Sequence, residues 1–338
     1  MPVTMSRARV ARRIATAAAV GGGGIGLLGV ATVGVLLTEV RLARRTVGGS
    51  SDTPPCADGR YGAPFHHRDD GRPPLRLGFL GDSTAAGQGV HRARQTPGAL
   101  LASGLAALSE LPVEFHNVAL PGAQSDDLER QVELILADRD RTPDVCVIMI
   151  GANDVTHRMP PAESVRHLSE AVRRLRAAGC EVVVGTCPDL GTIEPVYQPL
   201  RWVARRLSRQ LAAAQTIGVV ENGGRTVSLG DLLGPEFEAH PRELFGPDNY
   251  HPSAEGYATA AMAVLPTLCA SLGLWPEEEQ PEAARGEGIL PVAQAAAEAA
   301  SEGGTEVSGR RAPWALLKHR RRRQLPDPES SGAPHKGR

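Results

Sequence analysis

Two segments that lie far apart in this sequence carry the residue types of nucleophilic catalysis. Ser83 follows the apolar run 77–80 and a glycine, which predicts a buried strand that presents a hydroxyl at its carboxyl end, where open α/β sheets bind ligands. A serine needs a base to become a nucleophile, and the base needs a third group that holds its tautomer. Asp248 lies three residues before His251, so one turn brings its carboxylate to the imidazole Nδ1 while Nε2 faces Ser83. We therefore predict Ser83 as nucleophile, His251 as base and Asp248 as the orienting acid.

Two further segments supply hydrogen-bond donors for a developing oxyanion. Attack on an ester carbonyl builds negative charge on oxygen, and donors must be aimed at that atom. Gly122 follows one apolar run, and its missing Cβ lets the backbone N–H approach closely, while Asn153 follows another run and offers a side-chain amide. Each segment alone also has a purely structural interpretation, as a turn at Ser83 or a helix cap at Asn153 or His251. Their combination favours a shared site.

Together the four segments resemble the conserved blocks of the SGNH, or GDSL, hydrolase family. The blocks are Gly-Asp-Ser at 81–83, the glycine at 122, Gly-Ala-Asn-Asp at 151–154 and Asp-Asn-Tyr-His at 248–251. The resemblance implies a catalytic triad of Ser83, His251 and Asp248, and an oxyanion hole made by the Ser83 backbone N–H, Gly122 and Asn153. It also implies a three-layer, flavodoxin-like α/β/α fold and no cofactor. Thr84 stands where the family name has leucine, at a position that varies among members.

The activity implied by this resemblance is the hydrolysis of a small-molecule or lipid carboxylic ester through an acyl-enzyme. The same triad can pass the acyl group to a sugar or lipid hydroxyl, and the sequence does not separate this acyltransferase from the esterase. A third hypothesis is a catalytically silent, membrane-tethered binding module, which predicts a missing catalytic residue; none is missing. We expect a serine esterase that acts as a monomer.

The segments between these blocks predict an α/β domain. Apolar runs alternate with helical patterns, and because parallel strands need crossover connections, this order favours a central parallel sheet of about five strands with helices on both faces. The expected strands are 75–80, 113–118, 145–150, 180–186 and 217–220, and the expected helices are 97–108, 126–137, 162–178, 200–214 and 253–272.

The N-terminal segment predicts membrane attachment. Residues 14–40 carry no charge before Glu39, and arginines flank both sides. At about 1.5 Å per residue, a helix of this length crosses a hydrocarbon core of roughly 30 Å. We expect residues 1–45 to form a transmembrane signal-anchor that holds the catalytic domain outside the cytoplasm, as a membrane-anchored bacterial member of the family. A cleaved signal peptide with secretion is the alternative, and the similar charge on both flanks also leaves the cytoplasmic face open.

The rest of the chain divides by composition. Residues 46–74 are rich in Gly, Pro, Ser and Asp, which indicates a linker, and residues 75–275 hold the predicted SGNH hydrolase domain. Residues 276–338 lack the spaced apolar residues of a core, so we expect a disordered tail with a basic cluster at 319–323.

The composition also argues against nucleic acid and metal as partners. A formal net charge of −1 provides no overall positive potential that would attract nucleic acid. The five cysteines show no metal-binding spacing, so no metal is expected, and the sequence leaves disulfides open.

Overall fold

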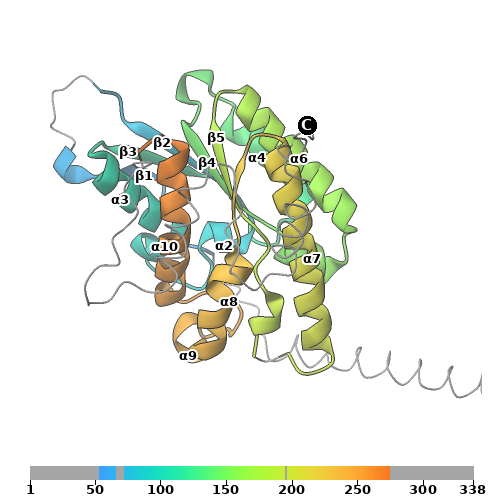
Figure 1. Ribbon diagram of the computed structural model, residues 1–338. Coiled ribbons are helices and arrows are strands. Elements are labelled where there is room, and N and C mark those ends of the chain that lie inside the picture. The colour runs from blue at the N-terminus through green and yellow to red at the C-terminus, as the bar shows by residue number, and fades with distance from the viewer. Residues whose placement is uncertain (1–52, 66–71, 195, 275–338) are drawn as a thin grey trace, which may run out of the picture.

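A six-stranded sheet forms the centre of the domain in the computed structural model, which describes residues 53–65, 72–194 and 196–274 (Figure 1). The strands are ordered β1-β3-β2-β4-β5-β6; β1 pairs with β3 antiparallel, and all other pairs are parallel. The predicted α/β fold with a parallel sheet is thus confirmed. The strands are β1 Gly59–Tyr61, β2 Leu75–Gly81, β3 Val113–Asn117, β4 Val145–Met149, β5 Glu181–Gly185 and β6 Arg225–Val227.

Helices connect the strands and cover the sheet. Local signals start several of them: Thr96 caps one helix through the N–H of Ala99, and Ser253 caps the last through the N–H of Gly256. The short 3₁₀ segments η3 (Ser125–Asp127) and η5 (Leu190–Thr192) adjoin the site described below. The α-helices are α2 Ser83–Ala86, α3 Pro97–Ser109, α4 Leu128–Ile135, α5 Ala152–His157, α6 Pro161–Ala177, α7 Leu200–Glu221, α8 Leu229–Ala239, α9 Pro241–Leu244 and α10 Ala254–Ser271.

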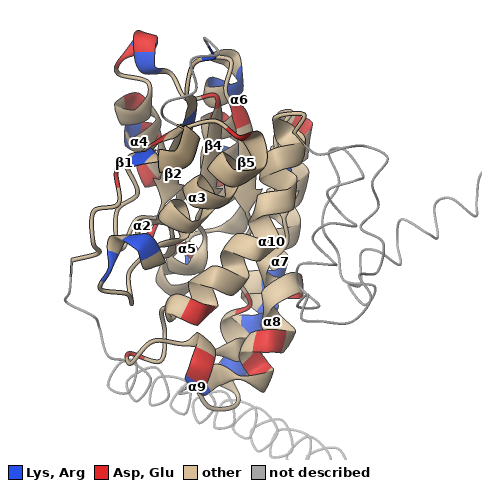
Figure 2. Cartoon of the chain, turned by 90° about the vertical axis from the view of Figure 1, so that its left-hand side faces the viewer, with Lys and Arg blue, Asp and Glu red and all other residues tan. Residues whose placement is uncertain are grey.

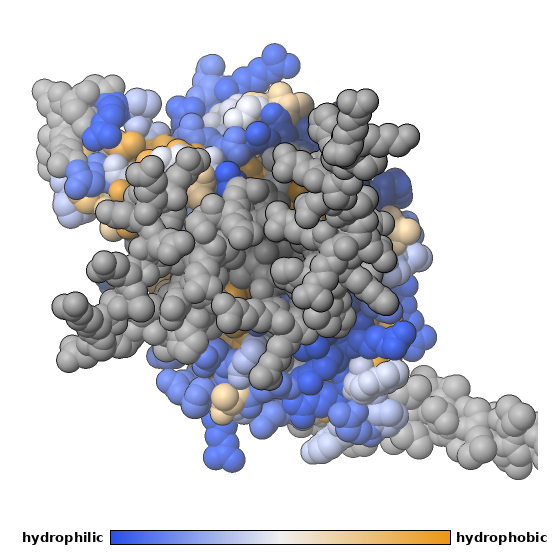
Figure 3. Space-filling model, viewed as in Figure 1, coloured by the Kyte–Doolittle hydropathy of each residue, from blue (hydrophilic) through white to orange (hydrophobic). Residues whose placement is uncertain are grey.

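The sheet separates two apolar cores. Neighbouring residues of a strand point to opposite faces, so Phe79 packs under α3 and α10, and Leu80 packs under α4 and α6. Figure 1 shows these helix pairs on either side of the strands. In Figure 2 the side formed by α3 and α10 is almost free of charged residues. The two helices together contain a single charged residue, Glu255 of α10. The described surface in Figure 3 is mostly hydrophilic toward the lower and right-hand parts of the view.

The strand order fixes where a ligand can reach the sheet. Leaving out the antiparallel β1, the chain places its first parallel strand, β2, between the second, β3, and the third, β4. The connections after β2 and β3 therefore leave the sheet in opposite directions, which opens a crevice at the carboxyl end of β2. Ser83 lies immediately beyond this end.

One predicted strand is wrong. Residues 217–220 belong to the last turns of α7, and the fifth parallel strand is β6, at 225–227. The β-branched run Ile-Gly-Val-Val suggested a strand, but its side chains follow a helical period: Val219 is buried with Gln215, whereas Ile217 is 61% exposed. Gly223 and Gly224 then end the helix before β6 begins.

The expected linker also differs from the structure in its described part. Residues 59–61, inside the range 46–74, form β1 and extend the sheet beside β3. The predicted anchor at 1–45 and the predicted tail at 276–338 lie outside the described residues, and both stay predictions. Among the described residues, no helix combines the length and apolar character that crossing a membrane requires.

The turn after β2 gives a stability prediction. Gly81 adopts φ +136°, and a Cβ there would lie 1.9 Å from the Met149 carbonyl oxygen. We expect Gly81→Ala to lower the free energy of unfolding by about 3 kcal/mol or more, since strain adds to a backbone clash. Gly179→Ala is the matched control, because Gly179 has φ +90° and no atom within 4 Å of an added Cβ; its cost should be about 1 kcal/mol. Urea unfolding measures both, and equal losses would contradict the role of the clash.

Candidate active site

The turn from β2 into α2 presents Ser83. Asp82 caps α2, because its carboxylate accepts the backbone N–H of Thr84 at 2.9 Å. The backbone N–H of Asp82 in turn donates to the carbonyl of Met149 at 3.0 Å, which ties the turn to the end of β4. Ser83 is consequently the first residue of α2, 8% exposed, at the carboxyl edge of the sheet.

His251 and Asp248 reach Ser83 from the segment before α10. The His251 Nε2 lies 3.0 Å from the Ser83 Oγ, and its Nδ1 lies 2.6 Å from the Asp248 Oδ2. With Nδ1 protonated and donating to the carboxylate, Nε2 is left as an acceptor for the serine hydroxyl. The structure thus brings the three residues predicted from the two distant segments into one hydrogen-bonded chain.

The turn at 248–251 holds the carboxylate in place. The Asp248 Oδ1 accepts the backbone N–H groups of Tyr250 and His251, each at 3.0 Å. Asn249, between Asp248 and Tyr250, adopts φ +54°. Burial acts to raise the pKa of Asp248, but the hydrogen bonds from the His251 side chain and from these two N–H groups outweigh it, so the pKa lies below its ordinary 3.8. The carboxylate is therefore ionised when it faces the imidazole.

The loop that contains Gly122 contacts the side chain of Asn153, and both lie next to the turn from β2 into α2. The Asn153 Nδ2 donates to the Ala123 carbonyl at 3.0 Å, and since an amide nitrogen carries two hydrogens, one donor remains. Gly122 has φ +84° with no atom within 4 Å of the Cβ position. The N–H of Leu120 donates to the Gly81 carbonyl at 3.1 Å, so this loop is fastened directly beside the serine turn.

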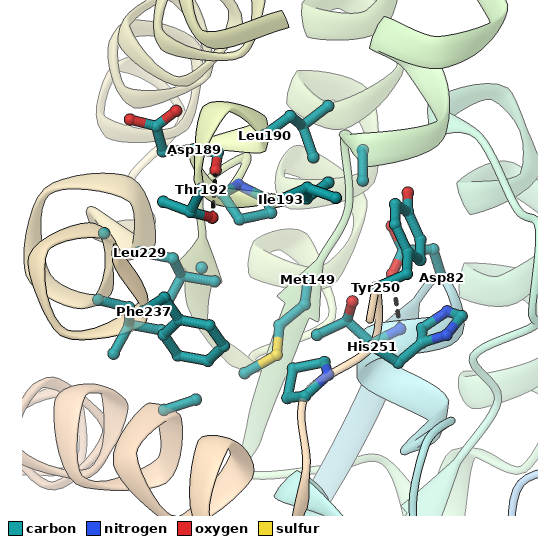
Figure 4. Close-up of a pocket in the computed structure, with 18 of the residues that line it drawn as sticks. Asp82, Met149, Asp189, Leu190, Thr192, Ile193, Leu229, Phe237, Tyr250 and His251 are labelled. Carbon is teal, nitrogen blue, oxygen red and sulfur yellow. Dashed lines mark hydrogen bonds between the residues drawn. The ribbon is translucent and has the colours of Figure 1, made fainter. Parts of the chain in front are cut away.

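An apolar pocket opens beside Ser83 and His251. It is a cavity of about 90 Å³ that extends between the ends of β4 and β5, η5 and α8. Figure 4 shows Tyr250 and His251 on one side of it and Thr192, Leu229 and Phe237 on the other. Its apolar lining includes Met149, Leu190, Ile193, Leu229, Leu233 and Phe237.

The described part of the chain holds neither a disulfide nor a candidate metal site. All five cysteines are free, which answers the question of disulfides that the sequence left open. No group of three or more His, Cys, Asp or Glu residues among the described ones is placed to hold a metal ion.

Comparison with known proteins identifies the family. The model of the GDSL-like lipase/acylhydrolase family matches residues 79–259. A GDSL-like esterase of Mycobacterium tuberculosis is 42% identical over 252 residues, which cover 73% of this chain and 79% of the relative. The chain belongs to the GDSL-like lipase/acylhydrolase family. It is accordingly a carboxylic ester hydrolase.

Two solved structures are similar to part of this chain. A catalytic mutant of an acetylxylan esterase from Geobacillus stearothermophilus is 20% identical, with a TM-score of 0.48, over 60% of this chain and 96% of the other. An alpha/beta hydrolase enzyme from the metagenome of Lake Arreo, Spain, is also 20% identical, with a TM-score of 0.46 over the same shares.

The loops of this GDSL-like hydrolase are held by buried polar residues, among them Asp154. Its Oδ1 accepts the N–H of Ser125 at 2.9 Å, and its Oδ2 accepts the hydroxyls of Ser125 and Ser164 at 2.5 and 2.6 Å. Asp154 is 1% exposed, so these bonds satisfy a carboxylate that has little access to water. The contact fixes the loop that contains Gly122 against the helix that contains Asn153.

Two glutamines were missed by the sequence analysis. The Gln131 side chain forms both hydrogen bonds of a peptide pair with Gly81, accepting its N–H at 2.7 Å and donating to its carbonyl at 2.9 Å. Gln215 accepts the N–H of Cys187 at 2.8 Å and donates to the carbonyl of Ile150 at 3.1 Å. The available signal was their spacing: each lies on the buried face of its helix, where an unpaired amide is costly.

Asp82 gives a testable pH dependence. Burial raises its pKa from 3.8 to about 6, against the opposing hydrogen bond from the Thr84 N–H. Between about pH 4 and pH 6 the folded protein therefore keeps a proton that the unfolded chain has lost, so this group lowers stability as the pH rises through that window, and its effect is constant above it.

We expect Asp82→Asn to remove this effect, because an amide does not ionise, while its oxygen still accepts the Thr84 N–H. The difference in unfolding free energy between variant and parent should shift in the variant's favour by about 3 kcal/mol from pH 3.5 to pH 7. Denaturant titrations at several pH values measure it. A difference that stays constant with pH would show that Asp82 ionises normally in the folded protein.

Proposed function

We propose that this GDSL-like hydrolase is a serine esterase in which Ser83 forms an acyl-enzyme, His251 acts as general base and acid, and Asp248 orients the imidazole. The observation that carries the proposal is the unbroken chain from the Asp248 Oδ2 through both ring nitrogens of His251 to the Ser83 Oγ, with distances of 2.6 and 3.0 Å. Both distances lie within the range required for proton transfer.

Acylation begins with attack on the ester carbonyl. The Ser83 Oγ–H proton passes to the His251 Nε2 as Oγ forms a bond to the carbonyl carbon, and the carbonyl electron pair moves onto oxygen. The ionised Asp248 stabilises the imidazolium that results. His251 then gives the proton to the alcohol oxygen as the bond between that oxygen and the carbonyl carbon breaks, which leaves the acyl group on Ser83.

Deacylation repeats the sequence with water. His251 takes a proton from water as its oxygen attacks the acyl carbon, then returns a proton to the Ser83 Oγ as the ester bond to the enzyme breaks. The products are a carboxylic acid and the free serine.

The oxyanion formed in both steps needs donors that are already in place. We propose the backbone N–H groups of Ser83 and Gly122 and the free amide hydrogen of Asn153 for this role. The support is positional, because Leu120 and Asp154 fasten the two donor loops to each other and to the serine turn. Fixed donors stabilise charge without the reorganisation that water requires.

The proposed triad predicts a large loss of activity when any of its three residues is replaced. We expect Ser83→Ala and His251→Ala each to lower kcat/KM for p-nitrophenyl acetate by about 10⁴-fold or more, and Asp248→Asn by about 10⁴-fold with KM little changed. Ser103→Ala, at an exposed serine of α3, is the control and should keep parental activity. Parental activity in the Ser83 variant would rule out this serine as the nucleophile.

The oxyanion hole predicts a loss confined to kcat. Asn153→Ala should lower kcat by about 10²- to 10³-fold and leave KM within a few-fold, because the missing donor acts on charge that develops only in the transition state. His157→Ala, at an exposed position of the same helix, is the control. A rise in KM at unchanged kcat would instead assign Asn153 to substrate binding.

A further inference from the structure

The apolar pocket that continues from Ser83 has a closed far side. Thr192, Leu229 and Phe237 form the side opposite His251, and each is 6% exposed or less (Figure 4). Met149, 2% exposed, lies between the two sides. A group that enters from the nucleophile therefore meets a wall of side chains rather than solvent.

The threonine hydroxyls along this wall already donate their hydrogens to the protein. The hydroxyl of Thr192 donates to the Asp189 carbonyl at 2.8 Å, and the hydroxyl of Thr186 donates to the Val227 carbonyl at 3.4 Å. The Asp189 carboxylate accepts the N–H of Gly191 at 2.8 Å and binds the Arg209 guanidinium, and Figure 4 shows it directed away from the pocket. These side chains offer a ligand no hydrogen-bond donor, and the residues between them are apolar, so the pocket fits a plain hydrocarbon chain.

The acyl part of the ester suits this closed pocket better than the alcohol part. The alcohol leaves before water attacks, so it needs a path to solvent. The acyl chain stays bonded to Ser83 until water releases it as the carboxylic acid at the end of the second step, so it occupies the pocket while the alcohol leaves. At about 90 Å³, the cavity is also smaller than the roughly 150 Å³ in which a buried site holds benzene, which favours a linear chain over a ring.

Gly234 of α8 lines the pocket next to Thr192, on the side opposite His251. A Cβ added there would lie 3.9 Å from the Cβ of Asp189 and 4.0 Å from the Cγ2 of Thr192, which are ordinary van der Waals contacts. Gly230, one turn earlier, has no such space, because its Cβ would come within 3.3 Å of the Asp189 nitrogen. Position 234 thus has room for a side chain beside Thr192, and that side chain would take up room in the pocket. The following residue, Pro235, disfavours a Cβ on the helical residue before it, so a substitution at 234 carries a cost in stability.

We propose that Gly234 sets the depth of an acyl pocket that selects esters of linear, unsubstituted fatty acids of short to medium length. This rests on the proposed function, since the chain must be bonded to Ser83 to enter the pocket as described. Replacing the glycine hydrogen by a methyl or isopropyl group shortens the pocket from its closed end and leaves the triad untouched.

The test uses the full chain and four p-nitrophenyl esters: acetate, butyrate, hexanoate and octanoate. Gly234→Ala and Gly234→Val are compared with the parent, and Ala239→Val, at an exposed position of α8, is the matched control. We expect kcat/KM for the longest ester that the parent accepts well to fall about tenfold or more relative to acetate in Gly234→Val, with a smaller fall in Gly234→Ala. Acetate hydrolysis should stay near the parental value in all variants, which also shows that they fold.

Other outcomes overturn the proposal. An unchanged chain-length profile in Gly234→Val, with acetate hydrolysis intact, would mean that the pocket does not hold the acyl chain. A second series, the acetate esters of ethanol, butanol and hexanol, varies the alcohol instead of the acid. If Gly234→Val lowered kcat/KM only for the longer alcohols of this series, the pocket would hold the alcohol part of the ester. Undiminished hydrolysis by Ser83→Ala would refute Ser83 as the nucleophile. That result is distinct from an unchanged chain-length profile in Gly234→Val, which would refute only the acyl pocket.

Discussion

The hydrogen bond between His251 and Ser83 is the interaction on which the site depends, and it joins residues 168 positions apart in the chain. Neither partner can be placed locally. Ser83 is set by the turn out of β2, and His251 by the start of α10. A second contact ties the same two segments: the hydroxyl of the fully buried Tyr257 in α10 donates to the Gln88 carbonyl just beyond α2 at 2.6 Å. The packing of α10 on the sheet therefore sets the distance between His251 and Ser83.

On the other side of the site, buried polar side chains from the surrounding helices hold the loops in place. Strand ends at the crevice leave backbone groups without ladder partners, and buried groups of this kind must be satisfied. Gln131, Gln215 and Asp154 supply those partners from three different helices. Each polar side chain fixes one loop, so the candidate oxyanion donors are held by the same bonds that stabilise the fold. Loss of one of them should affect both stability and catalysis.

The sequence predicted the parts of the structure that follow from local patterns. Apolar runs such as 145–150 gave buried parallel strands, and the strand-to-turn positions of Ser83, Gly122 and Asn153 placed these residues at one edge of the sheet. The pattern misled at 217–220, where helix α7 continues because its packing overrides the β-branched run. It also missed β1, whose three residues gain a partner only from β3.

Tertiary contacts explain the remaining omissions. Gln131 gains its role only when α4 packs against the end of β2, and Gly234 matters only because α8 faces η5 across the pocket. An apolar stripe such as that of α8 reads as an ordinary core helix, since nothing in its spacing marks a pocket. Recognisable chemistry resides in short motifs, whereas the shape of the substrate site arises from residues that no motif contains.

The most direct test of the central claim is to trap the acyl-enzyme. The protein is mixed with p-nitrophenyl butyrate, quenched in acid within the first turnover and digested, and the peptides are analysed by mass spectrometry. We expect a butyryl group on the side chain of Ser83 in the peptide that carries it, and no butyryl group on that peptide from the His251→Ala variant under the same conditions. An active enzyme that shows no adduct even under trapping with a fluorophosphonate, or an adduct on a different residue, would contradict it.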